Sequence, residues 1–450
     1  MSRTPPQPFG DTMSGDDTTV RTTTAMAGQP EPPRPAEPAT AAHGLARTVL
    51  AGLDEAAVRW CLLRGGPEAL VAPGDLDLLI APADLARAVA VVEAHGLIRL
   101  AGHGRGSHRF FLGLDGASRS WVELDLVTEL AYGRHFEVRT GAADRCLGRR
   151  VRQDDVWVLA PGDEFWALLL HCVLDKGTVA GHHLRRLRQL ADHATTDGPL
   201  PRALPDQAVR MLLAYWRVGH PAALSAVRRR LLAAWWRARP ASAARRVLGS
   251  AALRSIERPL QAWSRRGAGV ALIGPDGSGK STLARGIESA FYFPVRRVYM
   301  GLWPSSEAPR STTEQGLRIL LRPFTVWRRY LAAVRHRALG RMVVFDRYVY
   351  DALLPPRGPL VWLKRPYFQL LSRLCPAPDV VLLLDVPGSV MYRRSGEYDP
   401  EHLEREREQY RRLRRRVPHL ERVDADRAPE LVLADALGRI WRHYVERAAR

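Results

Sequence analysis

A short glycine-rich run constrains the fold of this chain more than any other feature. The run Gly274-Pro275-Asp276-Gly277-Ser278-Gly279-Lys280-Ser281-Thr282 matches the spacing G-x-x-x-x-G-K-S. An apolar segment, 269–273, precedes it, and a helix-compatible segment, 282–291, follows it. Strand, glycine loop and helix in this order let backbone N–H groups and a helix N-terminus surround phosphate oxygens. The sequence therefore predicts an α/β fold with a phosphate-binding loop at the end of a strand.

The same run indicates which ligands the chain binds. We expect the whole of 274–282 to contact the phosphates of ATP. Lys280 would reach the β- and γ-phosphates, and Ser281 would offer its hydroxyl to Mg²⁺. The only other lysines are Lys176 and Lys364, so the basic composition of the chain does not explain Lys280. ATP and Mg²⁺ are the expected cofactors.

From residue 267 onward, strand patterns alternate with helical ones, which predicts a parallel sheet with helices on both faces. The strand candidates are 268–273, 296–301, 341–346, 379–386 and 420–424. The third ends in Asp346, with Arg347 directly after it, at the sheet edge where ligands bind in such folds. A carboxylate there can hold Mg²⁺, and an arginine can clamp a phosphate. Arg393 and Arg394 follow the fourth strand and can neutralise charge during phosphoryl transfer.

Several stretches together resemble thymidylate kinase in their order and spacing. They are the run 274–282, then Asp346-Arg347-Tyr348, then Leu384-Asp385-Val386-Pro387 with Arg393 and Arg394, and finally Val423-Asp424-Ala425. The resemblance covers 267–450 and implies a P-loop kinase fold that transfers the γ-phosphate of ATP to a nucleoside monophosphate or another small acceptor. It implies that Asp276 faces the sugar side of the acceptor, Arg347 binds the acceptor phosphate, and Arg393 or Arg394 is the lid arginine. Together with Lys280, these are the expected catalytic residues.

The acceptor half of this resemblance is incomplete. The family's serine and its base-recognising glutamine are missing after Tyr348, where the chain runs Val349-Tyr350-Asp351-Ala352. The family's Arg-Glu-Pro-Gly segment is replaced by 299–306, which contains Trp303. The acceptor is therefore open between dTMP, another nucleotide and a sugar. We assign acceptor binding to Asp346, Arg347, Tyr348, Trp303 and Asp351, with Tyr350 as a further candidate.

A second constellation precedes residue 150. Asp75 and Asp77 lie on one predicted strand, pointing to the same face, and Asp125 lies on another. With Gly65-Gly66 they resemble the nucleotidyltransferase superfamily over about 45–150, which implies an α+β domain whose three carboxylates hold two divalent cations. Arg64 stands where that family has an apolar residue, and the serine after the glycine pair is absent. Either nucleotidyl transfer or a fold kept for substrate binding fits these residues.

The chain is expected to have four segments. A proline- and threonine-rich tail, 1–43, is predicted to be disordered; the nucleotidyltransferase-like domain, 44–150, a helical connector, 151–266, and the kinase-like domain, 267–450, follow. His171, Asp175 and Lys176 on the connector are expected to be surface or capping groups. Its segment 225–249 combines arginines with Leu and Trp, and we favour a packing helix over one lying on a membrane surface.

Composition limits the partners, metal sites and cellular compartment that we expect for this chain. The net charge is +20, but no basic groove with interleaved aromatic residues predicts a specific nucleic-acid partner. The cysteines form no C-x-x-C pair, which argues against a zinc site or a disulfide framework. With no secretory signal and no apolar stretch of bilayer length, a cytoplasmic protein is expected. We also consider a homodimer.

The patterns leave three functions open. The first is a kinase acting through the glycine-rich run. The second is a nucleotidyltransferase acting through Asp75, Asp77 and Asp125, with the kinase-like domain supplying or sensing nucleotide. The third is a regulatory protein that binds ATP without turning it over, which the missing acceptor motifs keep open.

Overall fold

The computed structural model describes residues 44–70, 74–100, 107–218, 223–249, 267–301, 312–355, 361–373, 375–396 and 398–448. We call 44–249 the amino-terminal part and 267–448 the carboxy-terminal part. The expected disordered tail, 1–43, and the acceptor candidate Trp303 lie outside the described residues.

The carboxy-terminal part is built on a five-stranded parallel sheet. The strands are β10 (Gly269–Ile273), β11 (Val295–Tyr299), β12 (Met342–Asp346), β13 (Val380–Asp385) and β14 (Leu420–Asp424), in the order β11-β12-β10-β13-β14. Every residue of the central β10 is buried, as expected for a parallel strand covered on both faces. The predicted parallel sheet is confirmed, because each strand falls on a predicted segment.

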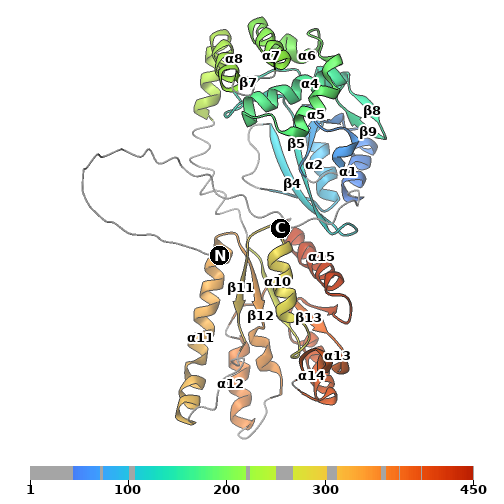
Figure 1. Ribbon diagram of the computed structural model, residues 1–450. Helices are drawn as coiled ribbons and strands as arrows, with labels where there is room; N and C mark the ends of the chain where they lie inside the picture. Colours follow the sequence, from blue (N-terminus) through green and yellow to red (C-terminus); the bar gives the residue numbers. More distant parts are fainter. Residues whose placement is uncertain are drawn as a thin grey trace, which may run out of the picture. The chain divides into compact units, whose positions relative to one another are not determined.

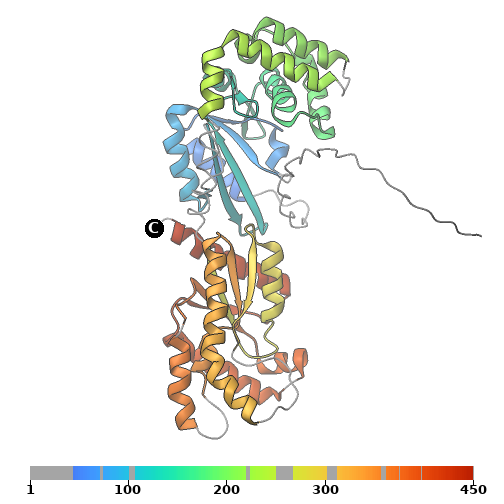
Figure 2. The ribbon, with the colours of Figure 1, turned by 90° about the vertical axis from the view of Figure 1, so that its left-hand side faces the viewer.

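Helices cover both faces of this sheet (Figure 1). Val270 and Leu272 of β10 pack with the helices α10 (Lys280–Ala290) and α15 (Pro429–Ala448). Ala271 and Ile273, which point the other way along the strand, pack with α11 (Thr312–Ala338) and α12 (Val361–Arg373). Figure 2 separates α11, in orange, from α10, in yellow, with strands between them. Two helices, α13 (Gly388–Ser395) and α14 (Pro400–Arg412), follow β13.

The amino-terminal part contains a mixed seven-stranded sheet in the order β3-β4-β5-β2-β1-β9-β8. Its strands are β1 (Trp60–Leu62), β2 (Leu76–Ile80), β3 (Ile98–Arg99), β4 (His108–Asp115), β5 (Ser120–Val127), β8 (Val151–Gln153) and β9 (Val156–Val158). The β2–β5 and β1–β9 pairs are parallel and the other pairs antiparallel. A short hairpin, β6 (Ala131–Tyr132) with β7 (Val138–Arg139), and α3 (Ala143–Gly148) lie between β5 and β8.

The two faces of this mixed sheet are covered differently. The helices α1 (Gly44–Glu55) and α2 (Leu85–Ala94) pack on one face with Trp60, Leu78 and Phe111. The helical segment shares a second core with Cys61 and Leu79. Its elements are α4 (Pro161–Leu170), the π-helical turn η3 (His171–Lys176), α5 (Gly181–Gln189), η4 (Ala191–His193), α6 (Pro199–Ala203), α7 (Asp206–Val218), α8 (Leu224–Ala238) and helical residues 240–249. The sheet thus continues past residue 150, where the sequence predicts a boundary.

Helix α8 carries the arginine- and tryptophan-rich sequence of the connector. Its Leu231 and Trp235 are buried in the core shared with the sheet, and Arg239 lies over the Trp235 ring at 4.6 Å. This helix therefore packs with its apolar face inward. None of the helices among the described residues is long and apolar enough to cross a membrane.

Candidate functional site

The glycine-rich run forms a loop between β10 and α10, and two of its glycines are required by the backbone. Gly277 has φ of 80° and Gly279 has φ of 93°, both in the left-handed region that side chains disfavour. A Cβ atom on Gly277 would lie 2.8 Å from the carbonyl oxygen of Met391 in α13. The loop is therefore pressed against α13, the helix that carries Arg393 and Arg394.

Lys280 lies at the start of α10 with its side chain folded onto the loop. Its Nζ donates to the carbonyl oxygen of Pro275 at 2.6 Å and lies 3.7 Å from Oδ1 of Asp276. Burial, followed by the nearby charge of Arg347, lowers the pKa of the Lys280 ammonium to about 8. A phosphate in the loop would offset both effects, because it supplies the opposite charge.

Ser281 and Asp346 meet at the carboxyl edge of the sheet. The Ser281 hydroxyl donates to Oδ2 of Asp346 at 3.0 Å, and the sheet register sets Asp346 beside Leu272, two residues before the loop. A hydroxyl and a carboxylate are oxygen ligands of the kind Mg²⁺ takes in nucleotide sites, where phosphates and water complete its shell. The expected pair thus fits Mg²⁺.

Arg347 joins two other predicted acceptor-side residues, Asp276 and Asp351, into one cluster. Its guanidinium forms an ion pair with Asp276 of the loop and lies 3.6 Å from Oδ2 of Asp351 in η6 (Val349–Leu353). Burial opposes the charge of Arg347, but Asp351 and Asp276 outweigh it and raise the pKa of the guanidinium. Arg347 also has φ of 65°, a conformation that costs a non-glycine residue about 1–3 kcal/mol and is typical of functional sites.

Asp351 is the most deeply buried member of this cluster. Its Oδ1 accepts a hydrogen bond from the Tyr410 hydroxyl at 3.0 Å, and its Oδ2 is buried without a hydrogen-bond partner among the described residues. Burial raises the pKa of the Asp351 carboxyl, although Arg347 and Lys280 oppose this. Tyr410 was missed in the sequence because it lies on α14, whose charges are typical of a solvated helix.

A carboxylate at the end of β13 anchors α14. Asp385 accepts hydrogen bonds from Arg407 and Arg411. Burial acts to raise the pKa of Asp385, but these hydrogen bonds and charges together lower it. The same helix carries Tyr410, so Asp385 positions the group that contacts Asp351. Sequence spacing alone gives no sign of these two arginines.

Other expected site residues occupy different positions. Tyr348 is fully buried and donates its hydroxyl to the Pro376 carbonyl at 2.6 Å, so its side chain is a core group and not an acceptor contact. Tyr350 packs in the same core. Arg394 donates to the carbonyl oxygen of Ala425 at 3.2 Å, and Arg393 is exposed on α13.

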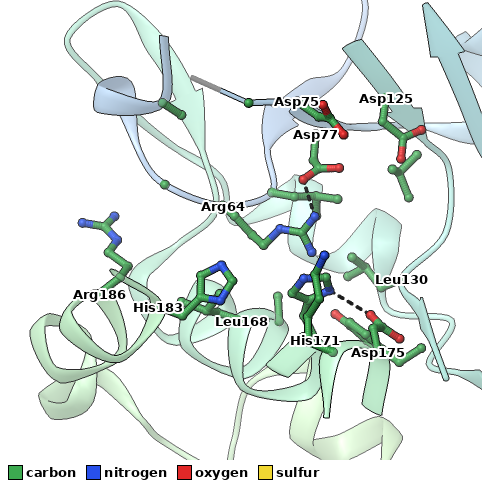
Figure 3. Close-up of a pocket in the computed structure, with 18 of the residues that line it drawn as sticks. Arg64, Asp75, Asp77, Asp125, Leu130, Leu168, His171, Asp175, His183 and Arg186 are labelled. Atoms are coloured by element: carbon green, nitrogen blue, oxygen red, sulfur yellow. Dashed lines mark hydrogen bonds and ion pairs between the residues drawn. The ribbon is translucent and has the colours of Figure 1, made fainter. Parts of the chain in front are cut away.

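A second candidate site is a cavity of about 1150 Å³ in the amino-terminal part (Figure 3). The carboxylates of Asp75, Asp77 and Asp125 all line it, as the sequence predicts. The parallel β2–β5 register sets Asp77 directly beside Asp125. The predicted gathering of acidic residues therefore forms at this sheet.

Two of these carboxylates are already paired with protein groups. Arg64 forms an ion pair with Asp77, and Nδ1 of His108 lies 2.5 Å from Oδ2 of Asp125. Burial raises the pKa of the Asp125 carboxyl, partly offset by His108. Within the described ranges, no group of three or more His, Cys, Asp or Glu residues is arranged to hold a metal ion. The donor set as it stands does not fit a two-metal centre.

The opposite wall of the cavity carries histidines and cations. Figure 3 shows Arg64 between the carboxylates on one side and His171 on the other, with His183 further along. Nδ1 of His171 lies 2.9 Å from Oδ2 of Asp175, whose Oδ1 accepts from the Gly133 N–H at 2.7 Å. The expectation that His171, Asp175 and Lys176 are surface or capping groups is confirmed for Asp175 and Lys176, which are exposed. All three residues also line the cavity, which the sequence did not predict.

A partly buried ion pair fixes the glycine turn of the cavity. Arg186 of α5 donates two hydrogen bonds to Glu164 of α4, at 2.8 and 2.7 Å. The N–H of Gly65 donates to the same carboxylate at 3.3 Å. Helices of the predicted connector thus hold the turn that follows Arg64.

Comparison with known proteins adds no family to this description. Neither the family models nor the curated proteins include a match to the chain.

Proposed function

We propose that the carboxy-terminal part is a thymidylate kinase-like phosphotransferase that moves the γ-phosphate of ATP to a small acceptor. The observation that carries this proposal is a convergence at one edge of a parallel sheet. Lys280, the Ser281–Asp346 pair and the Asp276–Arg347–Asp351 cluster all lie where the strands β10 and β12 end. Triphosphate-binding and acceptor-binding groups are thereby adjacent, as an in-line transfer requires.

In the proposed reaction, ATP phosphates lie against the backbone N–H groups of the loop. Lys280 exchanges its bond to the Pro275 carbonyl for the β- and γ-phosphates. Ser281 and Asp346 would hold Mg²⁺, which would neutralise further phosphate charge. The acceptor oxygen bonds to the γ-phosphorus while the bridging oxygen leaves with ADP.

Arg347 and Asp351 would set the acceptor class. A phosphate on the acceptor can replace Asp276 as a partner of the Arg347 guanidinium, because both are anions. An acceptor that reacts through a hydroxyl must also lose a proton. Asp351, whose pKa is raised and whose Oδ2 lies 3.6 Å from the Arg347 guanidinium, is the carboxylate that we assign as the base. A nucleoside monophosphate needs no such base, since its phosphate oxygen is already ionised.

The rival proposal places nucleotidyl transfer in the amino-terminal cavity. The pairing of Asp77 with Arg64 and of Asp125 with His108 counts against it, because transfer to an α-phosphate by two metals needs free carboxylate oxygens. An ATP-binding protein without turnover is the third alternative, and only an assay of products separates it from the first.

Two variants of the full chain test whether the carboxy-terminal or the amino-terminal part carries the transfer activity. Lys280→Ala should abolish transfer from ATP, whereas the double variant Asp75→Ala/Asp77→Ala should retain it. Lys364→Ala, on α12, is the matched lysine control and should behave as the parent. Loss of activity in the double variant, with Lys280→Ala still active, would reverse the assignment.

A further inference from the structure

One wall of the cavity in the amino-terminal part, formed by η3 and α5, carries Lys176, Arg185 and Arg186 against the single carboxylate of Asp175. The lining as a whole holds six Asp or Glu residues and five Arg or Lys residues. At the acidic end of the cavity Asp77 is paired with Arg64, and on the η3–α5 wall Asp175 is paired with His171. Lys176 lines the same wall and has no ion-pair partner among the residues the structure describes. His182 and His183 complete the wall, with ring centroids 4.0 Å apart. The surplus charge of this wall is therefore cationic.

Three buried polar atoms of residues lining this cavity lack hydrogen-bond partners. They are Nδ1 of His183, Nε2 of His108 and the hydroxyl oxygen of Tyr132, judged within the described ranges. Tyr132 is only 5% exposed. Buried polar groups in folded proteins are nearly always hydrogen-bonded, so unpaired atoms beside one cavity indicate that a polar ligand completes them.

The surroundings of His183 give the sign of that ligand. Burial and the neighbouring His182, His171, Arg64 and Lys176 all lower the pKa of the His183 imidazole, to about 4. The neighbours with the largest electrostatic effect on this ring are thus cationic or become cationic on protonation. An anion bound between them would relieve the mutual repulsion and favour the protonated ring.

We propose that this cavity binds a small molecule bearing a phosphate monoester, held by Lys176 and His183 without a divalent metal. Arg64 already forms an ion pair with Asp77, so this carboxylate is not free to bind a metal ion at the acidic end of the cavity. A volume of about 1150 Å³ exceeds what a free phosphate needs and suits a sugar phosphate or nucleotide. Asp75 at the acidic end can accept hydrogen bonds from the hydroxyls of such a molecule.

This site is separate from the phosphotransfer site proposed above, and its test should not depend on that one. The full chain carrying Lys280→Ala removes the lysine expected to bind phosphate at the glycine loop. Calorimetric titrations in EDTA with inorganic phosphate, glucose 1-phosphate and AMP then report on the cavity. Plain glucose serves as the probe without phosphate. Comparison of the three phosphate probes shows whether the cavity binds free phosphate, a sugar phosphate or a nucleotide.

At least one phosphate probe should bind without metal, and glucose should bind more weakly. In the same background, Lys176→Gln and His183→Ala should each weaken that probe about tenfold, the size of one lost charge-assisted hydrogen bond. His193→Ala, an exposed histidine of the same part that does not line the cavity, should bind as the parent. Unchanged binding in both cavity variants, or binding that appears only with Mg²⁺, would overturn the proposal.

A second measurement needs no variant in the cavity. The imidazole resonances of His183 should titrate at a higher pH when the bound probe is present, because an anion stabilises the protonated ring against His171, His182, Arg64 and Lys176. A titration midpoint that does not move at saturating probe would place the phosphate elsewhere and refute the assignment.

Discussion

Replacing Asp385 with asparagine should loosen helix α14 and, through Tyr410, the acceptor side of the kinase-like site. Asp385 is 6% exposed at the end of β13. One of its oxygens accepts from the Nε atoms of Arg407 at 2.5 Å and Arg411 at 3.2 Å, and the other from Nη2 of Arg411 at 2.8 Å. Asparagine keeps one acceptor oxygen but removes the charge that both arginines share.

The expected cost follows from the burial of these partners. The Arg407 side chain is 16% exposed and that of Arg411 is 34% exposed, so solvent screens the second pair more. A hydrogen bond to a charged group contributes about 1.5–3 kcal/mol net, and an exposed ion pair about 0–1 kcal/mol. We expect Asp385→Asn to lower the free energy of unfolding by about 2–3 kcal/mol.

The effect should depend on pH with a defined sign. The folded pKa of Asp385 is lowered, so its stabilisation is complete above the unfolded value of about 3.9 and is lost as pH falls through the folded value. The difference in unfolding free energy between parent and variant should therefore be constant from pH 7 down to about 5 and shrink in acid.

Urea denaturation followed by tryptophan fluorescence measures this difference, together with the rate of phosphoryl transfer. Glu408→Gln is the matched control, since Glu408 lies on the same helix and forms exposed pairs with Arg411 and Arg412. It should change the unfolding free energy by less than about 1 kcal/mol. If Asp385→Asn costs no more than Glu408→Gln, the anchoring role of Asp385 is wrong.

Three further changes probe the kinase-like site. Gly277→Ala places a Cβ atom 2.8 Å from the Met391 carbonyl oxygen, at a residue whose φ is 80°. The rate of transfer should therefore fall at least about tenfold, and the free energy of unfolding should fall by about 1–2 kcal/mol. Gly438→Ala is the control and should retain both rate and stability, because a Cβ atom there meets nothing within 4 Å. Tyr410→Phe removes a hydrogen bond that lowers the pKa of Asp351, so the acid limb of the pH–rate profile with a hydroxyl acceptor should move to higher pH; an unmoved limb excludes Asp351 as the base. ATP affinity should fall as pH rises above about 8, where free Lys280 loses its proton, and Lys280→Arg should flatten that profile in a binding titration.

The central sheet of the carboxy-terminal part could be predicted because its signals are local. Continuous apolar runs such as 380–384 mark strands buried on both faces, and the glycine spacing marks the turn that follows β10. Asp346 ends β12 and Arg347 follows it, while Lys280 and Ser281 begin α10 after the glycine loop. Predicting the strands and the loop therefore also located these candidate residues.

The parts of the sites that the sequence missed depend on long-range approach. Tyr410 reaches Asp351 across 59 positions, and the arginines that bind Asp385 belong to a helix whose composition is typical of a solvated surface. Arg64 was noticed as a departure, but its ion pair with Asp77 depends on how the glycine turn is held by Glu164 and Arg186. The expected acceptor contact at Tyr348 is wrong, because the position of a residue in the motif says nothing about which way its side chain points.

The most direct test of the proposed activity is transfer of label from γ-labelled ATP by the full chain with Mg²⁺. The acceptors to compare are dTMP, other nucleoside monophosphates and a panel of sugars. We predict a labelled phosphorylated acceptor that forms with the parent and with Lys364→Ala but is absent with Lys280→Ala. Label that never leaves ATP for any acceptor, or that transfers equally well in Lys280→Ala, would contradict the proposal.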